Sequence, residues 1–351
     1  MNKHLKSVLF LSLNLLLVLL FVSCTKIPSN NNGRFRGVMS SNTATEADLK
    51  TLRFEWKANL IRCQLKQLNP KSPSDMSEYD AWLNDALYDL DRVLSYCKTY
   101  RIKVIIVLMS VPGGRNADQE NLIFYNQTFH DKFISVWQKI ASRYNQHPAL
   151  LGYDLINEPT QLNSPPQGLD CLSTQLEAAE AIRIIDPITR IYIEVTNGDG
   201  PLGYSNFKPV NLPNVEYEVH MYEPHEFTHQ QVNGNFLPVA TYPGTINSIY
   251  YDQNQLKEIL QPARDFQVKY GVRMYVGEFS AVRWAPGAAQ YLKDCIDIFE
   301  EYGWDWSYHA YRNWTGWNLE HEDGTPNSAS VLATVRTDRM NVVLAGLALN
   351  Q

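Results

Sequence analysis

Several features are scarce in this 351-residue sequence, and each scarcity excludes a class of protein. Basic residues do not outnumber acidic ones: 31 Lys and Arg stand against 37 Asp and Glu, for a formal net charge of −6. A mildly acidic chain is a poor candidate for nucleic-acid binding. No GxGxxG or GxxxxGK[ST] motif follows any expected strand, so nothing supports a phosphate-binding α/β fold.

Cysteine is also rare, with five in the chain, and no pair has the CxxC spacing or a spacing typical of metal ligands. Cys24 belongs to the N-terminal segment. Export would permit disulfides among Cys63, Cys97, Cys171 and Cys295, but their spacing does not require any. We therefore expect these four residues to be buried free thiols.

The N-terminal segment resembles a targeting signal. Residues 1–23 have a positive start and the apolar run Val8–Val22, which is short for a membrane span and typical of a secretory signal. The ending "FVSC" resembles a bacterial lipoprotein signal, with Cys24 lipidated and 25–33 as a flexible tether. Ordinary cleavage and an uncleaved anchor are the alternatives. We expect an exported protein, bound to the bacterial cell envelope (outer membrane or cell surface) through a lipid anchor only, or secreted without lipidation.

From Gly33 onward, short apolar segments alternate with amphipathic ones, and no low-complexity linker interrupts them. The expected strands are Phe35–Ser40, Asn59–Leu65, Val104–Met109, Leu150–Ile156, Ile191–Val195, Val215–Tyr222, Met274–Glu278 and Trp304–Tyr308. The expected helices are Ser77–Tyr100, Thr128–Asn145, Leu172–Ile185, Gln253–Tyr270 and Pro286–Tyr302. This pattern predicts one α/β domain over 34–351, a (β/α)8 TIM barrel, with a doubly wound open sheet as the alternative. The fifth crossover should be short, and the segment after the sixth strand an elaborated loop.

Polar side chains collect near the carboxyl ends of the expected strands, where barrel enzymes carry their active sites. Because side chains alternate along a strand, Glu218, His220 and Tyr222 share one face of the sixth strand. One such residue would be interpreted as structural, but several on different strands favour an active site. The set is Arg62 on the second strand, Asn157 and Glu158 after the fourth, His220 and Tyr222 on the sixth, Glu278 on the seventh and Trp306 on the eighth.

Two members of this set, Glu158 and Glu278, are carboxylates from the fourth and seventh strands, which can face each other across a barrel mouth. Glycoside hydrolysis requires two carboxyl groups flanking one bond, one of them protonated and the other ionised. Asn157 and Arg62 can hydrogen-bond to a sugar hydroxyl or to the ionised carboxylate. Tyr222 can donate to Glu278 and keep it ionised. The pattern favours a glycosidase.

Six stretches in order carry a family resemblance: "GRFRGVMS", "ANLIRCQ", "LINEP", "EVHMYEPHEFTHQ", "YVGEFS" and "WDWSYHAYRNW". They span almost all of residues 33–320 and resemble glycoside hydrolase family 5, the cellulase family, within the clan of barrel glycosidases. The resemblance implies retention of anomeric configuration, carboxyl groups about 5–5.5 Å apart, and no metal or organic cofactor. At the matched positions the resemblance implies that Glu158 is the general acid/base and Glu278 the nucleophile. It implies that Asn157 binds the 2-hydroxyl of the sugar, and that Arg62 and Tyr222 keep Glu278 ionised. It also implies that His220 contacts the substrate or Glu158, and that Trp306 is the aromatic platform under the scissile sugar.

One position departs from the family pattern. Met109 stands where members usually carry a His at the end of the third strand, which leaves the sugar specificity open. Trp284, Trp314 and Trp317 are either further sugar platforms or packing residues.

The function we expect is endo-acting hydrolysis of a β-1,4-glucan by a monomer, with polysaccharide or oligosaccharide as the only partner. β-Mannan, xyloglucan and β-1,3-glucan are alternative substrates. A non-catalytic surface lipoprotein that binds glycans is a second hypothesis; it predicts loss of one carboxylate, and both are present. A zinc hydrolase is a third, because "HEFTH" (His225–His229) matches HExxH. That motif requires a helix, and the nearby "NGN" predicts that any helix there is very short.

Overall fold

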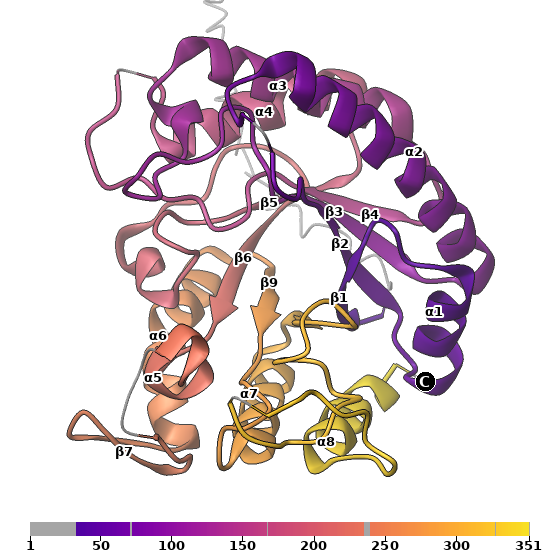
Figure 1. Cartoon of the computed structure of the whole chain (residues 1–351). Helices are drawn as coiled ribbons and strands as arrows, with labels where there is room; N and C mark the ends of the chain where they lie inside the picture. The colour runs from indigo at the N-terminus through magenta and orange to yellow at the C-terminus, as the bar shows by residue number, and fades with distance from the viewer. Residues whose placement is uncertain (1–32, 71, 167, 235–238, 327, 351) are drawn as a thin grey trace, which may run out of the picture. The chain divides into compact units, whose positions relative to one another are not determined.

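Eight parallel strands of the computed structural model close into a barrel in the order β1-β10-β9-β6-β5-β4-β3-β2 (Figure 1). The structure describes residues 33–350, apart from 71, 167, 235–238 and 327. The barrel strands are β1 Arg36–Ser41, β2 Leu60–Leu65, β3 Lys103–Leu108, β4 Leu150–Asp154, β5 Arg190–Ile193, β6 Val215–Met221, β9 Met274–Phe279 and β10 Asp305–Tyr308. The closure confirms the predicted (β/α)8 barrel and excludes the open sheet.

Helices connect the barrel strands and lie outside them (Figure 1). They are α1 Glu46–Lys50, α2 Met76–Tyr100, α3 Gln127–Tyr144, α4 Cys171–Ile185, α5 His225–Thr228, α6 Gln253–Tyr270, α7 Ala288–Tyr302 and α8 Asp338–Ala348. The five predicted helices are confirmed to within one or two residues, whereas α1 and α8 were not predicted. A π-helical turn, Thr51–Glu55, follows α1. The fifth crossover is short as predicted, since its one helical segment is a 3₁₀ turn, Pro201–Asn206.

Side-chain caps fix where the longer helices begin. Asp75 accepts hydrogen bonds from the backbone N–H groups of Ser77 and Glu78 at the start of α2. Asp252 caps α6 in the same way. That helix ends at Gly271, whose φ of 64° lies in the left-handed region that glycine adopts without strain.

The barrel interior is layered, and the layering positions the site. The apolar layer consists of Phe35, Leu60, Ile105, Leu151, Tyr192 and Tyr275. Two residues beyond Leu60 and Tyr192 toward the carboxyl ends stand Arg62 and Glu194, both buried. On β6 the predicted alternation is confirmed: His220 is buried inside, while the ring of Tyr217 packs on Phe266 of α6 with centroids 4.9 Å apart. A polar layer therefore rests directly on an apolar one.

The segment after β6 is an elaborated loop, as predicted. It holds α5, a 3₁₀ turn over Val232–Gly234, and a two-stranded antiparallel hairpin of β7 Gly244–Ile246 and β8 Ile249–Tyr251. Throughout the described ranges, no helix is both long enough and apolar enough to cross a membrane. The expected signal, the Cys24 lipidation site and most of the tether lie outside the described residues.

The four expected thiols are free and buried, as predicted: Cys63, Cys97, Cys171 and Cys295. Burial raises the pKa of the Cys63 thiol to about 12. These residues are therefore packing residues in the core.

Candidate active site

Arg62 of β2 is the centre of the site. Its side chain is fully buried and its guanidinium reaches carboxylates from four other strands and one amide. The contacts are Nε to Asp154 Oδ2 at 2.8 Å, Nη1 to Glu278 Oε1 at 2.8 Å and to Asn157 Oδ1 at 3.1 Å, and Nη2 to Glu194 Oε1 at 2.9 Å and Glu218 Oε1 at 3.0 Å. A buried guanidinium persists only when its donors are satisfied, and here they are shared among several acids.

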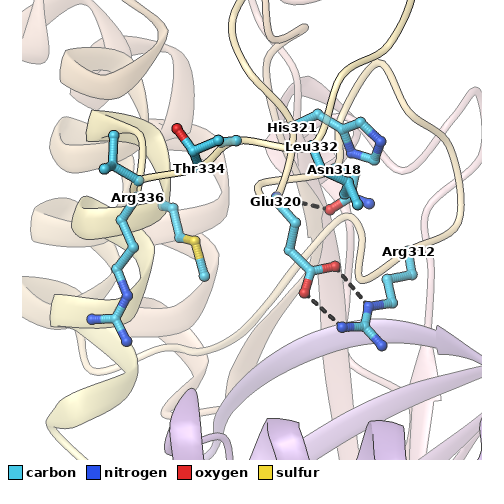
Figure 2. Close-up of a pocket in the computed structure, with 10 residues that line it drawn as sticks. Arg312, Asn318, Glu320, His321, Leu332, Thr334 and Arg336 are labelled. Atoms are coloured by element: carbon cyan, nitrogen blue, oxygen red, sulfur yellow. Dashed lines mark hydrogen bonds and ion pairs between the residues drawn. The ribbon is translucent and has the colours of Figure 1, made fainter.

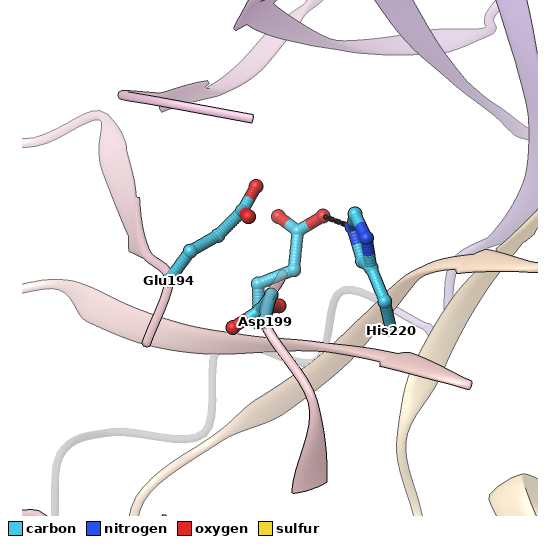
Figure 3. A group of neighbouring side chains, drawn as sticks. Glu194, Asp199 and His220 are labelled. Carbon is cyan, nitrogen blue, oxygen red and sulfur yellow. Dashed lines mark hydrogen bonds and ion pairs between the residues drawn. The ribbon is translucent and has the colours of Figure 1, made fainter. Parts of the chain in front are cut away.

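Beneath the mouth, buried carboxylates outnumber the cations beside them. Figure 3 shows Glu194, Asp199 and His220 converging, with a ring nitrogen of His220 3.2 Å from Glu218. Burial raises the pKa of Asp154 to about 8, against the opposing pull of Arg62. Burial and neighbouring acids also raise the pKa values of Glu194 and Asp199 well above their usual range. Protons therefore neutralise part of this cluster.

The same cluster has the composition of a cation site, because ligand atoms of Glu194, Asp199, Glu218 and His220 all lie within 4.8 Å of one another. However, both ring nitrogens of His220 contact carboxylates, Glu158 on one side and Glu218 on the other. Burial would lower the pKa of His220, but Glu278, Glu158 and Glu218 raise it well above its usual value. A protonated imidazole has no lone pair for a metal, so the donor set fits protons better than a metal ion.

Glu158 follows β4 and is held by its backbone from both sides. Its N–H donates to Glu194 Oε2 at 2.7 Å, and Arg115 donates to its carbonyl at 2.8 Å. Its φ is 47°, a left-handed value that costs a non-glycine residue free energy and that these two bonds stabilise. The side chain is 37% exposed, and its Oε1 lies 3.0 Å from Nδ1 of His220. The backbone thus presents the carboxyl group to the barrel mouth.

Glu278 at the end of β9 is the more enclosed glutamate. Arg62 binds Oε1, and the Tyr222 hydroxyl donates to Oε2 at 2.8 Å. Nδ1 of His309 lies 2.8 Å from the same Oε2. Burial would raise the pKa of Glu278, but His309, His220 and Arg62 together hold it well below its usual range. Glu278 is therefore ionised at neutral pH.

The two glutamates come together as predicted. Carboxylate oxygens of Glu158 and Glu278 and a ring nitrogen of His220 all lie within 4.8 Å of one another. The predicted contacts of Arg62 and Tyr222 with Glu278 are present, and so is the predicted contact of His220 with Glu158. Four different strands or strand ends, those of β2, β4, β6 and β9, thus converge on one point at the barrel mouth.

Trp306 requires a correction, because it does not lie in the site. Its side chain is fully buried on the outer face of β10, where its indole N–H donates to Glu300 of α7 at 2.8 Å. It also packs edge-on against Phe279. Strand alternation explains the error: Ser307 points inward, where its hydroxyl lies 2.6 Å from that of Tyr275, and Trp306 points outward. The inward residue at the mouth is His309.

The other three tryptophans have different surroundings. Trp314 and Trp317 line a cavity of about 420 Å³ together with His309, His229, Lys66, Val232 and Asn313. The Trp317 ring stacks on Tyr222 with centroids 5.7 Å apart, next to the nucleophile candidate. Trp284 is partly buried and donates its indole N–H to the Gln230 carbonyl at 2.8 Å, which is a packing function. Met109 is partly exposed and lines a separate cavity of about 230 Å³ with Arg115 and Asn121.

The HExxH stretch forms only the four-residue helix α5, so the predicted short helix is confirmed. The rings of His225 and His229 stack with centroids 4.9 Å apart, and His225 pairs with Glu223. Glu226 accepts a hydrogen bond from Asn247 on the hairpin loop. The stretch therefore lacks the helix that the zinc motif requires.

A cavity of about 580 Å³ is lined by the segment between β10 and α8 and by the start of α8 (Figure 2). Its wall carries the double ion pair of Arg312 with Glu320, at 2.6 and 2.7 Å. Neither Glu158 nor Glu278 lines it, so it is not the site of the two-carboxylate chemistry.

Five contributors were not predicted from the sequence: His309, Glu194, Asp199, Asp154 and Arg115. His309 follows the last barrel strand directly, and strand alternation leads to it only once Ser307 is known to point inward. Glu194 similarly ends the fifth strand. Asp154 is the last residue of β4, a strand buried on both faces, where no pattern separates inward from outward residues.

An (β/α)8 barrel with two glutamates from opposite strands, one ionised and both at the carboxyl end, defines a barrel glycosidase. The sequence matches the family described as cellulase (glycosyl hydrolase family 5) over residues 26–323. The chain belongs to this family and is a glycosidase, which confirms the resemblance.

Named relatives are similar in sequence, and solved structures share the barrel fold. Endoglucanase C of Acetivibrio thermocellus is 26% identical over 318 residues, covering 82% of this chain and 89% of the relative. Cellodextrinase A of Ruminococcus flavefaciens is 24% identical over 268 residues, covering 74% and 76%. Among crystal structures, a glycoside hydrolase aligns with a TM-score of 0.70 at 21% identity, covering 90% of this chain and 99% of its own. Thermotoga maritima Cel5A with cellobiose aligns with a TM-score of 0.65 at 18% identity, covering 90% and 96%, which supports the barrel fold.

Proposed function

We propose that the protein is a retaining endo-β-1,4-glucanase that works by double displacement, with Glu158 as acid/base and Glu278 as nucleophile. The observation that carries the proposal is the separation of their carboxylate oxygens, which is within 4.8 Å. Retaining glycosidases need carboxyl groups about 5–5.5 Å apart, whereas inverting enzymes need about 6.5–9.5 Å to admit a water.

In the first step, a carboxylate oxygen of Glu278 attacks the anomeric carbon while Glu158 protonates the departing glycosidic oxygen. Oε1 of Glu158 faces His220, so the transferred proton belongs on Oε2. The Glu158 side chain is 37% exposed and can reach a leaving group, whereas the Glu278 side chain is 4% exposed and is held in its ionised form by its neighbours.

In the second step, Glu158 removes a proton from water, and the resulting hydroxide attacks the glycosyl-enzyme and releases Glu278. Two inversions restore the original configuration. The side-chain carbonyl oxygen of Asn157 accepts a hydrogen bond from Arg62, so its amide N–H₂ can donate to the 2-hydroxyl of the sugar.

The substrate assignment rests on the relatives. The endoglucanase names support endo action on a glucan. The β-1,4 linkage is our proposal, and Met109 keeps β-mannan, xyloglucan and β-1,3-glucan as alternatives. Reducing-sugar release across these four glycans, followed by product analysis on defined oligosaccharides, tests linkage, endo action and stereochemistry together. We expect short β-1,4-gluco-oligosaccharides with retained configuration; inverted products would refute the mechanism.

Variants at the two glutamates separate hydrolysis from binding. Glu278→Ala should abolish hydrolysis and keep glycan binding, with a loss of at least about 10³-fold in kcat. Glu158→Ala should lose less activity on aryl glycosides with good leaving groups, because these need no protonation. A Glu278→Ala variant with the wild-type rate would remove Glu278 from the mechanism. Wild-type protein that binds glycans but hydrolyses none would instead favour the glycan-binding lipoprotein.

We also propose that the protein is exported and anchored to the bacterial envelope through lipidated Cys24. The apolar run Val8–Val22 before "FVSC" supports this proposal. Radiolabelled palmitate should label the wild-type chain and leave Cys24→Ser unlabelled and secreted. Equal labelling of both chains would refute it.

A further inference from the structure

His309 lies directly after β10, on the side of Glu278 opposite Arg62. Its side chain is 11% exposed, and Nδ1 lies 2.8 Å from Glu278 Oε2 and 2.6 Å from the Tyr222 oxygen. The imidazole ring contacts Trp317 with centroids 4.6 Å apart. His309 is thus shared between the nucleophile and the tryptophan-lined cavity.

The proton on this imidazole can be located from its neighbours. The Tyr222 hydroxyl donates its single proton to Glu278 Oε2 at 2.8 Å. A bare Nδ1 would place a lone pair 2.8 Å from the same carboxylate oxygen, which is repulsive. Nδ1 therefore carries a hydrogen and donates it to Glu278.

We propose that His309 is a positioning residue for the nucleophile: it fixes Oε2 of Glu278 and favours its ionised form, while Arg62 does the same for Oε1. The inference rests on the proposed function of Glu278. Charge-assisted hydrogen bonds to a carboxylate are about twice as strong as neutral ones, so a third donor on this group is a substantial contribution.

Few other groups around the His309–Glu278 pair can favour the ionised form of Glu278. The titratable and charged groups that face the pair are Arg62 from β2, Lys66 after β2, Glu158 after β4, His220 and Tyr222 from β6 and its end, and His229 after α5. Burial lowers the pKa of His229 to about 4, so that ring is neutral. Burial raises the pKa of Glu278, and His309 is the first of the neighbours that lower it, before His220 and Arg62.

The test uses an inactivator that does not need the acid. A dinitrophenyl 2-deoxy-2-fluoro-β-cellobioside reacts when a Glu278 oxygen bonds to the anomeric carbon and the dinitrophenolate leaves with the electron pair. Its rate against pH therefore follows ionisation of Glu278 alone, and peptide mass spectrometry identifies the labelled residue. The variants are His309→Gln, which keeps a neutral donor, and His309→Phe, which keeps only the ring. His147→Gln, on the loop before β4 at the opposite end of the barrel, is the matched control.

We expect wild-type inactivation to fall only in strongly acidic solution, and both His309 variants to fall at a pH higher by roughly 1–3 units. His309→Phe should also lose about 10- to 100-fold in inactivation rate at its optimum, because a hydrogen bond to a charged group is gone. His147→Gln should match wild type.

If the inactivation rate falls at the same acid pH in wild type and in both His309 variants, and the label is on Glu278, the inference is overturned and the proposed function stays intact. Label on a residue other than Glu278 in wild type would overturn the proposed function itself. If His309→Phe fails to fold, His309→Gln carries the test, since it removes the imidazole with little change in volume.

Discussion

Replacing Arg62 with Met should destabilise the protein in a manner that depends strongly on pH. The side chain is fully buried, and it is the one guanidinium that Asp154, Glu194, Glu218 and Glu278 share. Met fills a similar volume without charge, so the variant isolates the electrostatic loss. Removing one partner of a buried ion pair costs about 3–5 kcal/mol, and we expect a loss of this size in the free energy of unfolding at pH 7.5.

The pH dependence follows from the carboxyl groups left behind. Without Arg62 their folded pKa values rise above the unfolded value of roughly 4. A carboxyl group whose pKa is higher in the folded state binds more protons in the folded protein than in the unfolded chain. Its cost to the free energy of unfolding is therefore absent below the pKa of the unfolded chain and grows as the pH rises above that value. The wild-type cluster already shows this tendency, because burial raises the pKa of Asp154 to about 8 even beside Arg62. The deficit of the variant should therefore be much smaller near pH 4 than at pH 7.5.

Urea unfolding followed by tryptophan fluorescence at both pH values measures the difference. The control is Arg143→Met, which breaks an exposed pair with Asp91 on the outer helices. Its side chains are 42% and 40% exposed, so at most about 1 kcal/mol should be lost. A deficit below about 1 kcal/mol for Arg62→Met at pH 7.5, or an equal deficit at both pH values, would refute the reasoning.

Two further predictions concern packing. In Gly277→Ala the new Cβ would lie 1.5 Å from Glu218 Oε1, so Glu218 would be pushed off Arg62, and both the melting temperature and kcat/KM should fall. Gly200→Ala, whose Cβ would meet nothing within 4 Å, is the control; equal melting temperatures for the two variants would contradict the prediction. In a Cys24→Ser chain, Ellman's reagent should find no reactive thiol until the protein unfolds and then find four, and rapid reaction in the native state would show that the core is open. Those four are Cys63, Cys97, Cys171 and Cys295.

Most of the barrel could be predicted from the sequence, because its strands are continuous apolar runs separated by amphipathic helices of ordinary length. Predicted β6, Val215–Tyr222, and observed β6, Val215–Met221, differ by one residue. The terminal helix α8 escaped prediction. It carries Gly346 where Trp306 approaches, at 3.0 Å from the position of a Cβ, and it depends on that tertiary packing.

The site was predictable where a polar residue ends an apolar strand, as with Glu158 and Glu278. It was not predictable where adjacent residues compete for one place. In "WDWSYHA" aromatic residues alternate with Asp305 and Ser307, and an aromatic side chain can face either the outer helices or the barrel mouth. An error of one residue in the assumed alternation therefore exchanges the inward-facing and outward-facing residues. Trp306 was therefore expected inside, and His309 was overlooked. Only the pairing of β10 with β1, Trp306 opposite Arg36, fixes which side chain reaches the mouth.

The contrast between the two glutamates supports the proposed division of labour. Glu278 is 4% exposed in its side chain and receives hydrogen bonds from a guanidinium, a phenol and an imidazole, all of which favour the carboxylate. Glu158 is 37% exposed, faces one imidazole and is fixed mainly through its backbone by Glu194 and Arg115. A nucleophile must stay ionised and still, whereas an acid/base must exchange a proton with substrate and water in each cycle. The buried acids contribute to this contrast between the two glutamates. Because protons rather than a second guanidinium neutralise Glu194 and Asp199, the charge of Arg62 remains available to Glu278.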